Sequence, residues 1–414
     1  MQGPIMRSNK LPQFSPLRLV VRHFSATLCS CTAGILLAVA AVAGCSEGST
    51  GGSTTPPPNQ NTAIPTITTA AAQNGAVVVT LTDSTANATL YYTTDGSTPT
   101  TSSPKYYAPF LVSSNLTVSA LAAAPPLLNS SVATQAFASN IASGTLVWSD
   151  EFASNTAGAS AYGQPNPSTW TYDTGLGSVC CGNSELETYC AWSSSTGPCN
   201  PSNPNAYVGA DGYLHIVALS PAANVYTSAR LKSEGLFSFQ YGRIEARMML
   251  PESQGMWPAF WLLGNNIASI SWPACGEADV MEHIDGSNPP FSAGGTPAGY
   301  DWIAGSVHGG PSGSAEVNGS QMYHPTGFSA GAWHNYGMIW TKGQVQYYVD
   351  DPTNPANIYA TFNTSNFGGT WPFDQGPMFI ILNLAVGGSW PGNPDATTVF
   401  PGNMLVDYVR IYTN

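Results

Sequence analysis

The chain has 414 residues, of which 43% are hydrophobic and 8% are charged. A prior of roughly 100–200 residues per domain allows two or three domains, and the hydrophobic content excludes a chain that is disordered throughout. The 42 glycines and 33 prolines disfavour long helices, and 23 acidic against 11 basic residues argue against nucleic acid or anionic lipid as a partner.

The first 45 residues have the organisation of an export signal. Four basic residues and no acidic ones accompany an apolar run over 33–43, which is too short for a membrane-spanning helix of about 20 residues. The run 42–45, Val-Ala-Gly-Cys, resembles a bacterial lipobox, in which the cysteine is lipidated and becomes the mature N-terminus. The resemblance implies that residues 1–45 are a lipoprotein-type signal peptide. It also implies that Cys45 tethers the exported protein to the outer membrane or cell surface. Cleavage of a plain signal peptide, giving a secreted protein, is the alternative.

A linker and a small β module follow the leader. Residues 46–63 are mostly Gly, Ser, Thr and Pro, which predicts a flexible linker. Residues 64–140 are predicted to form a small β-sandwich, because short β-type runs separated by turn signals occur at 76–81, 88–93 and 116–121. The string 91–110 resembles part of the sandwich module at the C-terminal end of chitobiases and β-hexosaminidases. For this module a spacer role is favoured over sugar binding.

Five cysteines lie beyond the leader, at Cys180, Cys181, Cys190, Cys199 and Cys275. An exported protein can form disulfides. Cys190 and Cys199 bracket a short loop and could pair, whereas the partners of the two adjacent cysteines stay open. Because five is odd, one thiol is expected to be free. The adjacent pair lacks the usual spacing of zinc ligands, so a zinc site is the less favoured alternative.

Residues 145–414 are predicted to form one large β domain. All 11 tryptophans lie between Trp148 and Trp390. Apolar and polar residues alternate with a period of two over 241–250 and 344–349, between Gly, Asn and Pro breaks, which indicates a large antiparallel sandwich. The whole chain is therefore predicted to be all-β.

Three carboxylates within six residues carry the predicted chemistry. In a regular strand Glu277 and Asp279 share one face, and Glu282 points the other way. An extra residue at a β-bulge near Val280-Met281 would return Glu282 to the acidic face.

Such a cluster suits cleavage of a glycosidic bond. Neighbouring carboxylates resist ionising together, which leaves one proton donor beside one ionised nucleophile. Two carboxyl groups about 5–5.5 Å apart leave no room for a water molecule between them, and the reaction then retains the anomeric configuration. A calcium cluster and a solvated acidic face are the alternatives, although calcium needs about 6–8 oxygens.

The segment 272–282 resembles the active strand of glycoside hydrolase family 16, and in particular of its laminarinase-type endo-β-1,3-glucanases. Five further matching segments occur in order, at 148–152, 182–189, 241–247, 255–261 and 406–412. The resemblance covers nearly all of 145–414 and implies a concanavalin-like β-jelly roll with a substrate cleft on its concave sheet. It assigns Glu277 as nucleophile, Asp279 as its helper and Glu282 as acid/base. Ala278, where a bulkier aliphatic residue is usual, departs from the pattern.

The same resemblance suggests further roles. Substrate contacts are expected from Asn183, Arg243, Trp257, Trp261 and His308, with core packing as the alternative for the tryptophans. Trp390 is a candidate loop platform, and the cysteine-bearing insertion 178–204 is expected to shape one end of the cleft. Glu151 and Asp407 match the ligands of a structural calcium in some members, with hydrogen-bonded structural acids as the alternative. No cofactor is expected for catalysis.

Together these features predict a retaining endo-glycoside hydrolase. We expect it to act on β-1,3-linked glucan as a lipid-anchored monomer that touches the membrane only through Cys45. Mixed-linkage glucan and agar-type galactan are alternative substrates, and transglycosylation is an alternative reaction. A sugar-binding surface protein is the alternative from another class, although binding proteins of this kind lack the acidic triplet.

Overall fold

The structure is a computed structural model that describes residues 60–152, 162–284, 301–311, 316–367 and 371–414. The predicted signal peptide with Cys45 and most of the linker lie outside these residues. Helices in the described part are short: α1 (Gly177–Cys180), α2 (Ile267–Ile270), and the 3-10 turns η2 (Pro355–Asn357), η3 (Thr364–Phe367) and η4 (Pro372–Asp374). A search of the same residues finds no helix with the length and apolar character that a membrane crossing requires.

The N-terminal module consists of two three-stranded antiparallel sheets. One contains β1 (Thr66–Ala71), β2 (Val77–Thr82) and β4 (Phe110–Val112), and the other contains β3 (Thr89–Thr93), β5 (Leu116–Ala123) and β6 (Ala133–Phe137). Alternate side chains of both sheets meet in one apolar cluster that includes Val79, Tyr92, Phe110 and Val118. The predicted β runs at 76–81, 88–93 and 116–121 are confirmed.

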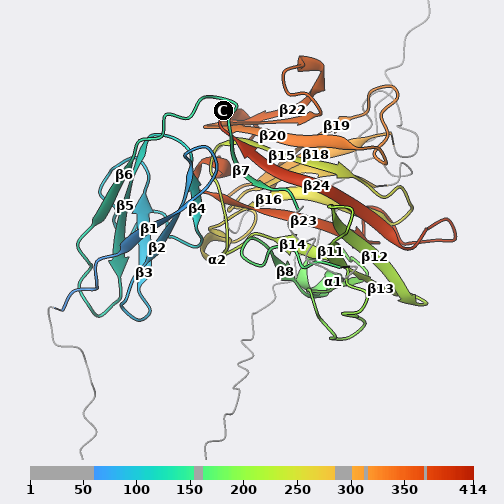
Figure 1. Cartoon of the computed structure of the whole chain (residues 1–414), viewed down its shortest axis with the longest axis horizontal. Coiled ribbons are helices and arrows are strands. Elements are labelled where there is room, and N and C mark those ends of the chain that lie inside the picture. Colours follow the sequence, from blue (N-terminus) through green and yellow to red (C-terminus); the bar gives the residue numbers. More distant parts are fainter. Residues whose placement is uncertain (1–59, 153–161, 285–300, 312–315, 368–370) are drawn as a thin grey trace, which may run out of the picture. The chain divides into compact units, whose positions relative to one another are not determined.

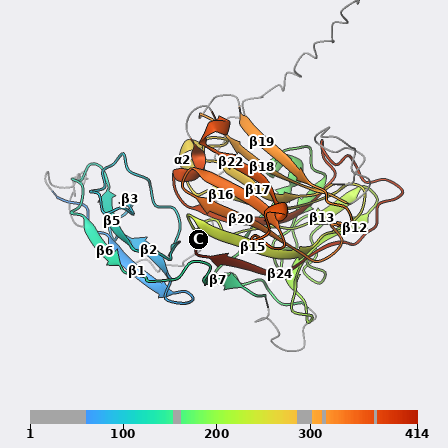
Figure 2. The same cartoon turned by 90° about the horizontal axis from the view of Figure 1, so that it is seen from above.

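The large domain has two facing sheets (Figures 1 and 2). The seven-stranded sheet has the order β19 (Val317–Tyr323), β18 (Ile303–Gly309), β17 (Glu277–Glu282), β16 (Met256–Gly264), β23 (Met378–Val386), β14 (Arg230–Lys232) and β8 (Thr171–Asp173). The three acids lie on β17, which they begin and end, and β17 lies inside this sheet between β16 and β18.

The eleven-stranded sheet forms the second layer. Its order is β22 (Ile358–Asn363), β21 (Gln344–Val349), β20 (His334–Thr341), β15 (Gly242–Met249), β24 (Gly402–Tyr412), β12 (Leu214–Ala222), β13 (Val225–Ser228), β10 (Glu187–Tyr189) and β9 (Gly175–Leu176). Two more strands pair beside this path, β11 (Ala206–Val208) with β12 and β7 (Leu146–Asp150) with β24.

The core lies between the two sheets and follows the period of two. Ile244 and Met248 of β15 point into it from one layer, and Phe260 and Leu262 of β16 point into it from the other. Burying alternate residues of both layers excludes water from their shared face and leaves the second face of each sheet for other contacts. The predicted all-β fold with a large jelly-roll sandwich is confirmed.

Two disulfides are present in the described residues. Cys190 pairs with Cys199, as predicted, and the adjacent Cys180 and Cys181 pair with each other. Cys275 is the free, buried thiol. The pairing of adjacent cysteines leaves neither of them available as a zinc ligand.

Candidate active site

A β-bulge at Val280 places the three acids of β17 on one face of the sheet. Across β16, Phe260 pairs with Met281 whereas Trp261 pairs with Asp279, so Val280 is the additional residue. The register with β18 shifts at the same place. Val280 and Met281 both enter the core, and Glu282 therefore returns to the side that carries Glu277 and Asp279. The predicted bulge is confirmed.

The face of the seven-stranded sheet opposite the core, here called the open face, carries the site. The side chains of Glu277 and Asp279 are 19% and 6% exposed. Their strand is flanked by the alternate residues of β16 that do not enter the core, among them Trp257 and Trp261. Carboxyl groups and aromatic rings thus share one surface, which is the combination that a sugar ring with apolar faces and hydroxyl edges requires.

His308 lies beside the acids on β18. Its Nε2 is 2.9 Å from Asp279 Oδ2 and 3.9 Å from Glu277 Oε1. Its Nδ1 forms a short contact with Glu316 Oε1, and Asn318 Nδ2 donates to the same oxygen at 3.0 Å. The structure therefore brings the predicted His308 to the acids, and it adds Glu316, which sequence reasoning missed.

Two tryptophans each donate a hydrogen bond to one of the outer acids. Trp257 Nε1 donates to Glu282 Oε1 at 3.0 Å, and Trp272 Nε1 donates to Glu277 Oε2 at 3.1 Å. The Trp272 side chain is 44% exposed, which is unusual for so large an apolar group. Trp257 was predicted to contact substrate, whereas Trp272 belonged to the motif without an assigned contact.

The electrostatics favour the protonated form of both outer acids. Burial, followed by repulsion from Asp279, raises the pKa of Glu277 and the pKa of Glu282. Positive charge on His308 opposes both shifts, and Arg230 opposes only that of Glu277. Both outer acids therefore resist ionisation, and Glu277 has one more cation nearby than Glu282 has.

His308 itself is held in its charged form. Burial alone would lower the pKa of His308, but attraction to Asp279 and the close contacts with Asp279 and Glu316 raise it to about 11. An imidazolium in contact with carboxylates keeps part of the negative charge of this buried cluster compensated.

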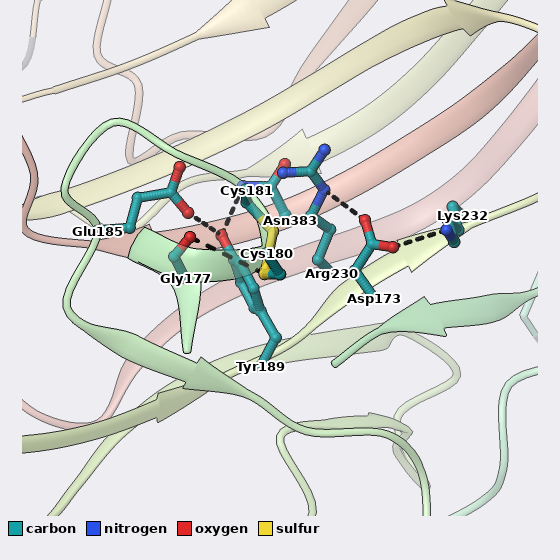
Figure 3. The surroundings of a disulfide bond; sticks show 9 residues. All are labelled: Asp173, Gly177, Cys180, Cys181, Glu185, Tyr189, Arg230, Lys232 and Asn383. Carbon is teal, nitrogen blue, oxygen red and sulfur yellow. Dashed lines mark hydrogen bonds and ion pairs between the residues drawn. A yellow bond between two sulfur atoms is a disulfide. The ribbon is translucent and has the colours of Figure 1, made fainter. Parts of the chain in front are cut away.

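Trp261 is fixed by its neighbours on the open face. Its Nε1 donates to Asn383 Oδ1 at 2.8 Å, and the Arg230 guanidinium lies 4.5 Å above its ring. Arg230 is paired with Asp173, and Asn383 donates to Tyr189, which donates to Glu185 (Figure 3). Trp261, which was predicted to contact substrate, thus lies on the open face, and its indole nitrogen is hydrogen-bonded to Asn383 within the protein.

The cysteine-bearing loop lies at this end of the open face. The Cys180–Cys181 disulfide has Asn383 and Arg230 in its surroundings (Figure 3). The next residues lie beside the segment that follows β23, where Ser389 donates its backbone N–H to the Asn183 carbonyl at 2.8 Å. Gly388, beside Asn183, also borders Trp257. The exposed Asn183 therefore lies in a loop next to the site.

Arg243 was predicted to contact substrate, but the structure does not bring it to the acids. It lies on β15 in the eleven-stranded sheet, and the alternation of that strand turns it away from the core and from the other sheet. Its Nη1 donates to Glu245 and Tyr348, and its guanidinium covers the Tyr412 ring at 3.8 Å. These contacts give Arg243 a role in the packing of β15.

The two acids expected to bind calcium are each paired with an arginine. Glu151 accepts two hydrogen bonds from Arg410, at 2.9 and 2.7 Å, and Asp407 accepts one from Arg247 at 2.7 Å. A calcium site needs several oxygens around one point, whereas these carboxylates face guanidinium groups. The alternative of structural acids fits both residues better.

Among the described residues, one group of three has donor atoms close enough for a metal ion. Atoms of Glu277, Asp279 and His308 lie within 4.8 Å of one another. Both ring nitrogens of His308 face carboxylates, so each carries a proton and neither has a lone pair to offer a metal. The arrangement fits an internal ion-pair cluster better than a metal centre.

Comparison with known proteins agrees with the fold and the motifs. The family model described as "Glycosyl hydrolases family 16" matches residues 202–410, and one described as "Fn3 associated" matches 79–137. The latter match does not test the likeness of the N-terminal module to the chitobiase module.

Individual relatives agree with the family assignment. A "Beta-glucanase" of Rhodothermus marinus is 36% identical over 282 residues, covering 64% of this chain and 84% of the relative. The laminarinase catalytic domain of Thermotoga maritima is 35% identical, with a TM-score of 0.51 over 66% of this chain and 99% of that one. The endo-β-1,3-glucanase of Pyrococcus furiosus is 37% identical, with a TM-score of 0.50 over 65% and 94%. With these matches, and with the acidic strand in the expected geometry, the chain belongs to glycoside hydrolase family 16.

Proposed function

We propose that the chain is a retaining endo-glycoside hydrolase of β-1,3-linked glucan. The observation that carries the proposal is the bulge at Val280, which places Glu282 on the same face as Glu277 with Asp279 between them. Relatives named as a laminarinase and an endo-β-1,3-glucanase support the choice of substrate.

In the first step the Glu277 carboxylate attacks the anomeric carbon. The bond from this carbon to the leaving oxygen breaks, and Glu282 gives its proton to that oxygen, so a glycosyl ester forms on Glu277. Asp279, in contact with His308, stays between the two acids and limits the reorganisation of charge.

In the second step the roles of the outer acids reverse. Loss of the negative charge on Glu277 removes a repulsion that raises the pKa of Glu282, so the ionised Glu282 can take a proton from water. The resulting hydroxide oxygen attacks the anomeric carbon and releases Glu277, with overall retention. The chemistry uses carboxyl groups and water and needs no cofactor.

Sugar-contacting roles are proposed for Trp257, Trp261, Asn183 and His308, which the structure places on or beside the open face. The loop with the Cys180–Cys181 disulfide is proposed to form one end of the substrate path, supported by its position beside Arg230 and Asn383. We also propose that the protein acts as a monomer, which is supported by the position of all three acids on one strand, β17.

A panel of polysaccharides tests the substrate. Laminarin, mixed-linkage β-glucan, agarose and cellulose are incubated with the protein, and reducing ends are measured. Highest activity on laminarin is expected, and proton NMR of the first product should show the β-anomer. Higher activity on agarose or mixed-linkage glucan would contradict β-1,3-glucan as the substrate. An α-anomer would contradict retention, and binding without hydrolysis would favour a sugar-binding protein.

We also propose that the protein is exported and lipid-anchored through Cys45. The basic and apolar pattern of residues 1–45 supports this proposal. Metabolic labelling with palmitate should modify the wild-type protein but not Cys45→Ser. Labelling of both proteins, or of neither, would contradict the anchor.

A further inference from the structure

His308 lies on β18, which is paired with β17 on one side and with β19 on the other. His308 pairs across the sheet with Glu277 on one side and with Asn318 on the other. Glu316 lies two residues before Asn318 and therefore shares its face of the sheet. This register brings Glu316, the residue just before β19, to His308 from the side opposite β17.

The two ring nitrogens of His308 face carboxylates in opposite directions. Nδ1 contacts Glu316 Oε1, and Nε2 lies 2.9 Å from Asp279 Oδ2. A neutral imidazole has one N–H and could satisfy one of these carboxylates, whereas satisfying both requires the imidazolium. Glu316 therefore adds to the effect of Asp279 in favouring the doubly protonated ring, and its contact with Nδ1 turns Nε2 toward the acids.

Glu316 is itself held in place for this contact. Asn318 Nδ2 donates to the same Glu316 oxygen at 3.0 Å, and the contact with His308 lowers the pKa of Glu316. The Glu316 side chain is 30% exposed and that of His308 is 21% exposed, so the pair is partly removed from solvent. Such a pair is screened less by salt and solvent than an exposed surface ion pair is.

We propose that Glu316 is a positioning residue for the hydrolysis proposed above: it fixes the His308 ring so that Nε2 faces Asp279 and Glu277, and it adds to the stabilisation that Asp279 gives to the charged form of that ring. The groups that act on His308 are Glu277, Asp279 and Glu282 from β17, Glu316 ahead of β19, and the Trp272 ring, whose centroid is 6.4 Å away. Of the carboxylates, Glu316 faces the ring from the side away from the acidic strand.

The first test reads the ring directly and needs no activity. Histidine side chains of the full chain are followed by proton–nitrogen NMR across pH, with the His308 signal assigned by its loss in His308→Asn. Removing a carboxylate in contact shifts a pKa by about 1–3 units, so Glu316→Gln should lower the pKa of His308 by that amount. Asp350→Asn is the matched control, because Asp350 pairs at 3.0 Å with His334 on the other sheet. It should leave His308 unchanged.

The second test is a double-mutant cycle on laminarin hydrolysis. We expect Glu316→Gln to lower kcat about tenfold with KM changed less than twofold, the loss typical of one charge-assisted contact. In the His308→Asn background the same substitution should change kcat less than twofold, because the residue through which it acts is gone. Circular dichroism checks that each variant folds. If Glu316→Gln does not fold, Glu316→Asp replaces it. Because Glu316→Asp keeps the negative charge, it should retain the high pKa of His308.

Two outcomes would overturn the proposal. One is an unchanged titration of His308 in Glu316→Gln, and the other is an equal loss of kcat in both backgrounds. Failure of the proposed function is distinguishable, because an inactive wild-type protein would still show, by NMR, whether Glu316 controls His308.

Discussion

The hydrogen bond from Trp257 to Glu282 gives a prediction with a definite sign. The bond is 3.0 Å long and stabilises the ionised carboxylate, so it opposes the rise that burial and Asp279 impose on the pKa of Glu282. A hydrogen bond to a charged group contributes about 1.5 kcal/mol, which corresponds to about one pKa unit. Trp257→Phe should therefore raise the pKa of Glu282 by about one unit.

The assay is the pH dependence of kcat/KM on laminarin. Its alkaline limb reports loss of the proton from the general acid of the free enzyme. That limb should move about one unit toward higher pH in Trp257→Phe, while the acidic limb stays within a few tenths of a unit. Loss of the indole also weakens the edge-to-face contact with Trp390, the candidate loop platform. Because both tryptophans are candidates for contact with the sugar, KM should rise.

The matched variant is Trp272→Phe, which removes the bond to Glu277 instead. That bond also stabilises an ionised carboxylate, so its loss should move the acidic limb upward by up to about one unit and leave the alkaline limb in place. An alkaline limb that stays fixed or moves downward in Trp257→Phe would show that the Trp257 hydrogen bond does not stabilise the ionised form of Glu282. The same conclusion would follow if both variants moved the same limb.

Three other predictions concern catalysis and stability. Glu277→Ala and Glu282→Ala should each lower kcat by about 10²–10⁴-fold or more without changing the circular dichroism spectrum, and near wild-type activity in either would reject its assigned role. Burial, followed by repulsion from Glu185, raises the pKa of Glu187 to about 8, so its stabilising effect is complete below its unfolded pKa of about 4.3 and is lost as pH rises through 8. The melting temperature of Glu187→Gln minus that of the wild type should therefore increase from pH 5 to pH 9, and a constant difference in calorimetry would contradict this. Replacing both Cys190 and Cys199 by serine should lower the free energy of unfolding by about 3 kcal/mol, since they close a loop with a separation of nine residues; an unchanged denaturant midpoint would show that the link does not constrain the unfolded chain.

The arrangement of the acids was predictable because it depends on local geometry. A period of two and the need for a third acid on one face were enough to predict the bulge near Val280. The placement of His308 followed from the family resemblance, and the sandwich followed from the alternation in β15 and β21. These features depend on patterns within one strand or on motifs long enough to identify.

Contacts between strands that are distant in sequence could not be predicted from such local patterns or motifs. Arg243 lies within a family motif, yet it belongs to the other sheet, which becomes visible only when β15 is paired with β20 and β24. Glu316 is an isolated acid that reaches His308 through the register of β18 with β19. Arg230 and Asn383 are likewise brought to Trp261 by the order of β14, β23 and β16.

The most direct test of the account is covalent trapping of the glycosyl-enzyme. A 2-deoxy-2-fluoro laminaribiosyl donor with a dinitrophenolate leaving group forms the ester without assistance from the general acid and slows its hydrolysis. After proteolysis, mass spectrometry should find the fluorosugar on Glu277 and on no other carboxylate, and Glu282→Ala should still be labelled. An adduct on Glu282, or hydrolysis of laminarin with inversion and no adduct, would contradict the claim that the bulged strand opposes a nucleophilic Glu277 to an acidic Glu282.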